Sequence, residues 1–111
     1  MAVIILEDTF PMDTKVAYLK ALNNVFQELQ IEKAKINSGN DSLWTLDVLM
    51  SVIQPEVKQL LTYACKNEAF FKYGDIRQLE STVFLSQCPE VLSQTDLGRS
   101  ILELQEIYNN L

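Results

Sequence analysis

Apolar residues recur every three or four positions along most of this chain, which is the spacing of one face of an α-helix. The most regular stripe lies at the C-terminal end and contains Leu97, Ile101, Leu104, Tyr108 and Leu111. Four earlier segments show the same period, so the sequence predicts helices at residues 13–36, 43–54, 55–73, 75–88 and 95–111. A chain of 111 residues holds one hydrophobic core. We therefore expect an all-α fold, a compact bundle of about five helices in a single domain spanning residues 1–111.

Turn and capping residues predict where these helices begin and end. The candidates for starting a helix are Asp13 for the first, Asp41 or Ser42 for the second, and Asp75, with Gln78 three positions later, for the fourth. Gly39 and Gly74 are suited to end the first and third helices. Pro55 fits a first helical turn, where its missing N–H costs nothing, and Pro89 marks the end of the segment before it.

The segment 43–54 is apolar almost all the way round, which predicts the most buried helix of the bundle. Its one polar strip consists of Asp47, Ser51 and Gln54, which share a helix face. Trp44 borders this strip, and its indole N–H needs a hydrogen-bond acceptor if the ring is buried.

Two segments fit the helical pattern poorly. Glu68 falls in the middle of the apolar stripe of residues 55–73, so either the helix bends near Asn67 or Lys72 accompanies Glu68 to the surface. Residues 3–6 have the composition of a β-strand, but the pattern shows no second strand to pair with them. We expect a short extended N-terminal arm that packs on the bundle or pairs with another molecule.

Composition places the chain among ordinary globular proteins. Apolar residues make up 48% and charged residues 22%, enough apolar surface to form a core without a metal or a disulfide. The apolar run 2–6 meets Glu7 and Asp8 at once and carries no basic region, so it predicts neither a signal peptide nor a membrane span. Cys65 and Cys88 match no metal or disulfide framework, and we expect both to be reduced and packed in a cytoplasmic protein.

The net charge of −6 is concentrated in the last third of the chain. Residues 73–111 contain six acidic and two basic side chains, whereas residues 1–72 contain nine acidic and seven basic ones. A nucleic-acid binder needs clustered lysine and arginine, so direct contact with nucleic acid or an anionic membrane is not expected. A basic protein surface, by contrast, is attracted to the acidic end.

The residue types that catalysis and cofactor binding usually require are scarce. The chain has no histidine, only three glycines, and none of the common nucleophile, metal or phosphate-binding motifs. We therefore predict no catalytic, cofactor-binding or metal site, and no enzyme activity. An enzyme with an unusual carboxylate site remains the third and least favoured reading.

Several residues remain outside the predicted core and form a candidate partner surface. Tyr63 and Phe70 share a second face of their helix, and exposed aromatic residues are common in binding hot spots. Leu102 lies beside Gly98, which leaves room for a partner helix, and two glutamates follow it. The full candidate set is Tyr63, Phe70, Tyr73, Leu102, Glu103, Glu106, Trp44 and Asp47. The competing interpretation assigns these residues to a core larger than the pattern suggests.

These observations favour an interaction module over an enzyme. The expected role is that of an inhibitor, an immunity-type protein or an adaptor that blocks or escorts a basic protein. The alternative is a structural homo-oligomer, at its simplest a homodimer, in which the leftover apolar faces pair with copies of themselves.

Overall fold

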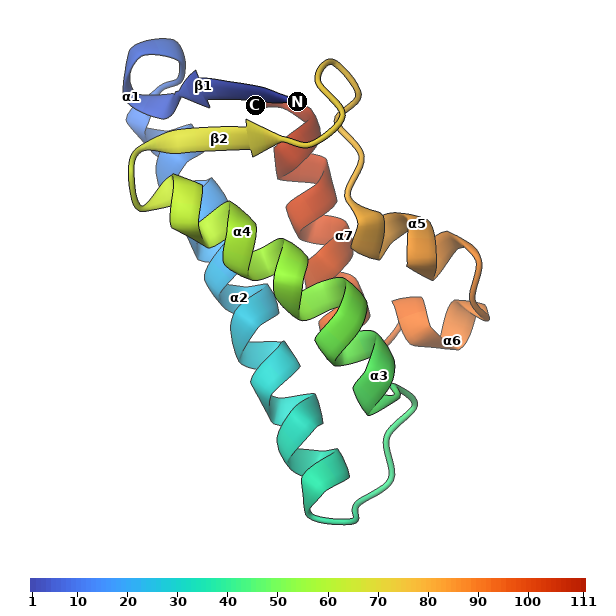
Figure 1. Cartoon of the computed structure of the whole chain (residues 1–111). Helices are drawn as coiled ribbons and strands as arrows, with labels where there is room; N and C mark the ends of the chain where they lie inside the picture. The colour runs from blue at the N-terminus through green and yellow to red at the C-terminus, as the bar shows by residue number, and fades with distance from the viewer.

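Two long helices, α2 (Met12–Asn37) and α7 (Asp96–Asn109), lie side by side and form the centre of the fold (Figure 1). The computed structural model describes all 111 residues, and helices hold 67% of them. The other helical elements are α1 (Leu6–Thr9), α3 (Leu46–Val48), the π-helical segment η1 (Leu49–Ile53), α4 (Gln54–Ala64), α5 (Glu80–Ser86) and α6 (Glu90–Ser93). Two strands, β1 (Ala2–Ile5) and β2 (Glu68–Phe71), complete the structure.

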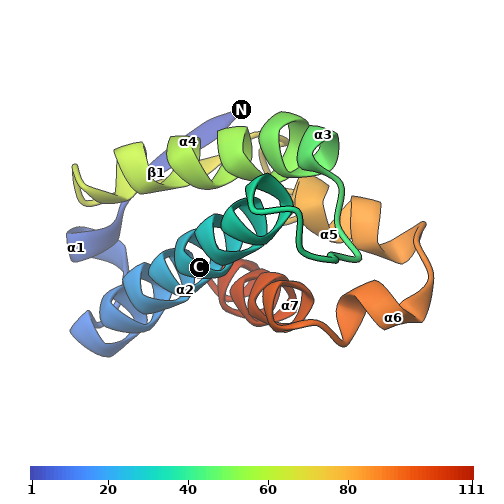
Figure 2. The same cartoon turned by 90° about the horizontal axis from the view of Figure 1, so that it is seen from below.

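The hydrophobic core confirms the apolar stripes of the first and last predicted helices. All five members of the C-terminal stripe are buried, and α2 buries Tyr18, Leu22, Val25 and Leu29. Val16, which the same apolar period predicts on the inner face of this first helix, is instead 54% exposed. α4 packs on α2, while α5 and α6 lie beside α7 (Figure 2). None of the helices combines the length and the hydropathy that a membrane-spanning segment requires.

The prediction of an all-α fold is wrong at the N-terminal arm. β1 pairs with β2 in an antiparallel register that places Ala2 opposite Phe71 and Ile5 opposite Glu68. The helix predicted for residues 55–73 ends at Ala64, and Asn67 adopts a positive φ of 60° that turns the chain into β2. The misplaced Glu68 was the signal for this break, since a strand allows it to stay partly exposed.

The segments predicted as separate helices at 43–54 and 55–73 form one continuous helical run through η1. Pro55 has no N–H to donate to Ser51, and the wider π turn before it uses a bond from Gln54 N–H to the Leu49 carbonyl instead. Leu43, Leu46 and Met50 are 58%, 39% and 41% exposed, so the prediction that 43–54 is the most buried helix is wrong.

Three predicted helix starts are also corrected. Thr45, rather than Asp41 or Ser42, caps the second helical segment by accepting a bond from the Val48 N–H. Pro11, rather than Asp13, precedes α2. α5 begins at Glu80, so Asp75 lies in a loop that includes Gly74 with φ 67°.

Other boundary residues behave as expected, and one cysteine does not. Gly39 follows α2 with φ 78°, and α6 begins directly after Pro89. Both cysteines are free thiols. Cys88 packs partly against the core, but Cys65 is exposed at the end of α4, which contradicts its predicted packing.

Candidate functional site

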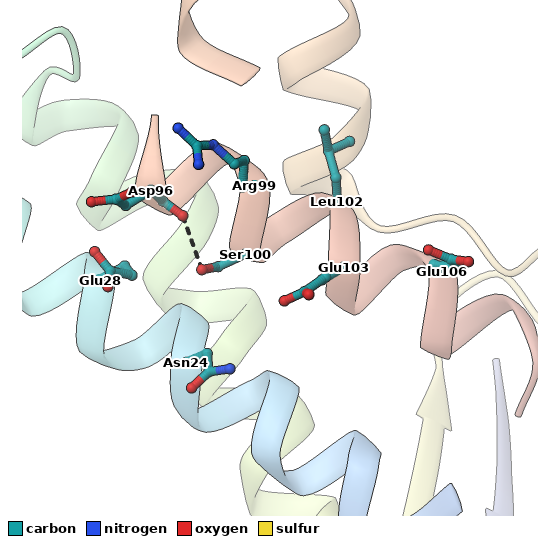
Figure 3. A pocket seen from close by; sticks show the side chains of 8 residues that line it. All are labelled: Asn24, Glu28, Asp96, Arg99, Ser100, Leu102, Glu103 and Glu106. Atoms are coloured by element: carbon teal, nitrogen blue, oxygen red, sulfur yellow. Dashed lines mark hydrogen bonds between the residues drawn. The ribbon is translucent and has the colours of Figure 1, made fainter. Parts of the chain in front are cut away.

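A groove between α2 and α7 is the largest hollow on the surface, with a volume of about 570 Å³. Its lining residues are Asn24, Glu28, Asp96, Arg99, Ser100, Leu102, Glu103 and Glu106 (Figure 3). An adjoining hollow of about 390 Å³ shares Asn24, Glu103 and Glu106 and reaches Lys20. We call the combined depression the α2–α7 groove.

The buried stripes of the two helices determine which side chains line this groove. α7 turns Leu97, Ile101 and Leu104 into the core, so residues 102, 103 and 106 point to the surface. On α2, Asn24 and Glu28 lie one turn apart and face α7 across the groove (Figure 3). The groove is therefore a direct consequence of pairing these two amphipathic helices.

Negative charge dominates the groove. Its four carboxylates belong to Glu28, Asp96, Glu103 and Glu106, and none of them takes part in an ion pair of the structure. The Arg99 guanidinium donates to the Gln94 carbonyl at 3.0 and 2.8 Å instead of to these carboxylates. The groove thus presents acceptors with no cation of the chain bonded to them.

Apolar side chains accompany the carboxylates: Leu102 in the larger hollow, and Ala17, Ala21 and Ile107 in the adjoining one. Leu102 of α7 is 41% exposed and is the one hydrophobic residue that lines the larger hollow. Carboxylates beside an exposed leucine are suited to a ligand that carries lysine or arginine next to an apolar group. No group of three or more cysteine, aspartate or glutamate side chains is placed to hold a metal ion.

Comparison with known proteins identifies no relative: no protein-family model matches the chain, and neither a curated protein nor a solved structure is detectably similar to it. The function is therefore inferred from the residues and their arrangement.

Three of the predicted partner-binding residues lie together. Leu102, Glu103 and Glu106 all line the α2–α7 groove. Gly98, which was expected to leave room for a partner helix, is buried beneath α6 instead, where its backbone meets the carbonyl of Leu92. The small residue at this position serves packing within the chain, and that part of the prediction is wrong.

Tyr63 and Phe70 do not form an exposed aromatic face. Their rings stack at a centroid distance of 4.7 Å with planes 17° apart, and Phe70 is only 3% exposed. Tyr63 comes from α4 and Phe70 from β2, so this stack fastens the strand to the helix. The competing interpretation of a larger core describes this pair correctly.

The remaining predicted residues are dispersed. Trp44 is 4% exposed, and its indole N–H donates to Thr95 Oγ1 at 3.2 Å, which supplies the acceptor that its burial requires. Asp47 is exposed and accepts a bond from the Ser51 hydroxyl at 3.4 Å. Tyr73 is 48% exposed and donates its hydroxyl to Glu80 at 2.7 Å. None of these three residues lines the α2–α7 groove.

Sequence reasoning missed the α2 side of the groove and the first turns of α7. Asn24 and Glu28 carried one signal, since they lie one turn apart beside the apolar face of a long helix. That signal gains meaning only when α7 is known to pack next to them. Asp96, Arg99 and Ser100 were likewise assigned only to the start of the last helix.

Glu56 is a further residue that the sequence pattern did not single out, and its role is structural. Its carboxylate accepts the Glu80 N–H at 2.6 Å, the Ser81 N–H at 3.0 Å and the Ser81 hydroxyl at 2.7 Å. A side chain of α4 therefore caps the N-terminus of α5. Burial raises the pKa of Glu56 above its usual value, although the bonds from Ser81 and Glu80 act in the opposite direction.

Proposed function

We propose that this protein is a binding module that recognises a basic protein through the α2–α7 groove. The observation that carries the proposal is the meeting of four carboxylates, none in an ion pair, with the exposed Leu102 in one depression. In this role the protein blocks or escorts its partner, as an inhibitor, an immunity-type protein or an adaptor does. It acts by binding alone, without a cofactor and without direct contact with nucleic acid or membrane.

The groove also defines the chemistry of the partner. Exposed ion pairs contribute little affinity individually, but their combined field accelerates the encounter of oppositely charged proteins. Leu102 offers an apolar contact in the same groove. The fitting partner segment therefore carries an apolar side chain flanked by lysine or arginine.

The test compares two double variants with the same change in net charge. Glu103→Lys with Glu106→Lys reverses charge inside the groove, and Asp75→Lys with Glu90→Lys reverses it at exposed positions outside the groove. Each immobilised protein is incubated with lysate from its native source, and retained proteins are identified by mass spectrometry. The dissociation constant of the purified partner is then measured at several salt concentrations.

We expect wild type and the outside variant to retain the same basic protein, and the groove variant to lose it. Affinity should fall as salt rises, because the partner is attracted by charge. Equal retention by all three proteins, or a partner whose binding ignores salt, would contradict the assignment of the groove.

Self-association is the second candidate function, and one specific feature favours it. β1 leaves one edge of the two-stranded sheet open to pairing. Tyr63, by contrast, is stacked on Phe70 within the chain and is not available as a contact between copies. That edge supports a separate inference.

A further inference from the structure

The outer edge of β1 presents backbone groups without a partner in the chain. The Leu6 N–H donates to the Asn67 carbonyl at 2.7 Å and continues the β1–β2 register. Alternate residues of a strand face opposite sides, so Ala2 and Ile4 bond to β2 while Val3 and Ile5 turn their backbone groups outward. The N–H groups of Val3 and Ile5 and the carbonyl of Val3 have no bond to any other element or side chain.

The opposite edge of the sheet is partly covered, because Phe70 is buried and its carbonyl has a partner. In the same register Phe70 turns its carbonyl away from β1, and the Tyr108 hydroxyl donates to that carbonyl at 2.7 Å. β2 packs on α4 and is reached by Tyr108 of α7, whereas β1 packs chiefly on β2 and α1 (Figure 1). Natural proteins usually cover or charge such an edge, because an open one pairs with other strands.

The side chains of β1 also suit pairing with an identical strand. Met1, Val3 and Ile5 alternate with the inward-facing residues and are 86%, 43% and 52% exposed. Residues 1–6 contain no charged side chain and no proline, although the whole chain has a net charge of −6. Two copies that meet at this edge thus avoid the like-charge repulsion that most of the surface imposes.

We propose that two copies of the chain pair through β1 in an antiparallel register with Val3 opposite Val3 of the second copy. This register bonds the N–H and carbonyl of each Val3 to those of the other and brings the Ile5 N–H to the carbonyl of Met1 of the second copy. It also places the three exposed apolar side chains of each strand opposite those of its twin. The product is a four-stranded sheet with a two-fold axis at Val3.

The first test measures mass against concentration by sedimentation equilibrium. Strands of four residues bury less surface than a standard stable interface, so the dimer should dissociate on dilution. Val3→Pro removes an outward N–H without touching the β1–β2 bonds, and edge positions tolerate proline. We expect wild type to approach the dimer mass in the millimolar range and Val3→Pro to remain monomeric. The control is Val16→Lys, which changes an exposed valine of α2 far from the strand edge in sequence. This variant should dimerise like wild type.

The second test probes the register and does not depend on the proline variant folding. In a background of Cys65→Ser and Cys88→Ala, Val3→Cys places two thiols across the axis at a Cα distance of about 5.5 Å, within disulfide range. Ile5→Cys places its thiols about 13 Å apart along the strands. Mild oxidation should link Val3→Cys into a dimer several times faster than Ile5→Cys.

Three outcomes would overturn the proposal: a monomeric wild type up to millimolar concentration, a folded Val3→Pro that dimerises like wild type, or equal cross-linking of the two cysteine variants. The proposal is independent of the groove. The Glu103→Lys and Glu106→Lys changes should leave dimer formation intact, so the two assignments can fail separately.

Discussion

At the scale of single residues, Gly98 shows how a missing side chain holds two helices together. A Cβ at this position would overlap the carbonyl oxygen of Leu92 and lie 2.9 Å from the Ser93 Cα. The backbone at the end of α6 therefore rests directly on the first turns of α7. Any larger residue must push α6 away from the core.

Gly98→Ala should consequently lower the free energy of unfolding by about 1–3 kcal/mol, the usual cost of overpacking. The higher helix propensity of alanine offsets about 1 kcal/mol of this steric cost. A measured loss of stability therefore shows that the steric cost is larger than the gain in helix propensity. Ser100→Ala, two positions along on the same helix, serves as the control and should change stability little. Urea unfolding followed by circular dichroism measures both. A stabilised Gly98→Ala variant would show that α6 moves aside freely.

Asn67 is the second residue whose backbone decides the local structure. Its positive φ of 60° ends the helical run of α4, and its carbonyl accepts the Leu6 N–H that extends the sheet. Left-handed backbone costs most residues about 1–2 kcal/mol, whereas glycine adopts it freely.

Asn67→Gly should therefore fold with unchanged or slightly higher stability, while Asn67→Ala should lose about 1 kcal/mol. Thermal unfolding of the two variants gives the comparison, with each variant acting as control for the other. Equal losses in both would point to the asparagine side chain, rather than to φ, as the source of stability.

At the scale of elements, α5 begins where a distant carboxylate meets it. Glu56 of α4 satisfies the N–H groups of Glu80 and Ser81, so the start of α5 is fixed by tertiary structure. Burial is the largest influence on Glu56 and raises its pKa, while hydrogen bonds from Lys72 and Tyr73 lower the pKa of Glu80. These opposite shifts predict opposite effects of pH on stability.

Folded Glu56 binds its proton more tightly than the unfolded chain does, so its contribution to stability is largest at low pH and is lost as pH rises through the raised pKa. The stability of wild type relative to Glu56→Gln should therefore increase as pH falls from neutral and level off below about 4.5, the usual value for this group. Urea unfolding at each pH measures this difference.

Glu80→Gln is the matched control because its pKa shift has the opposite sign. The stability of wild type relative to Glu80→Gln should decrease as pH falls through the usual range for glutamate. If both differences had the same slope, the cap formed by Glu56 would not experience the desolvation that its position implies.

The difference between local and long-range contacts explains which elements the sequence could predict. α2 and α7 were predicted because each carries its own apolar stripe over several turns, a signal contained in the helix itself. The pairing of β1 with β2 joins segments more than sixty residues apart, and neither strand has a local partner or turn that announces it. The start of α5 escaped for the same reason, since its cap belongs to another helix.

At the scale of the whole molecule, the sequence predicted only the α7 side of the groove. The outward direction of Leu102, Glu103 and Glu106 followed from the α7 stripe alone. Their pairing with Asn24 and Glu28 depends on the packing of α2 against α7, which periodicity does not specify. A groove between two elements belongs to the arrangement of the molecule, and only the structure reveals its excess of negative charge.

That excess predicts a conflict between stability and function at Glu106. This glutamate lies in the last turn of α7, where the helix dipole disfavours negative charge, and one turn after Glu103. Glu106→Gln should therefore raise the free energy of unfolding by less than about 1 kcal/mol at low salt, and added salt should abolish the gain. Urea unfolding at low and high salt measures this change.

The same substitution should weaken binding of the basic partner, because it removes one of the groove's four carboxylates. Glu90→Gln is the control: Glu90 lies in the first turn of α6, where negative charge is favoured, so its removal should bring no gain in stability and no loss of binding. A residue that costs stability and supports binding is retained for function. A destabilised Glu106→Gln variant would instead show that this carboxylate stabilises the fold, and the conflict between stability and function proposed for Glu106 would be wrong.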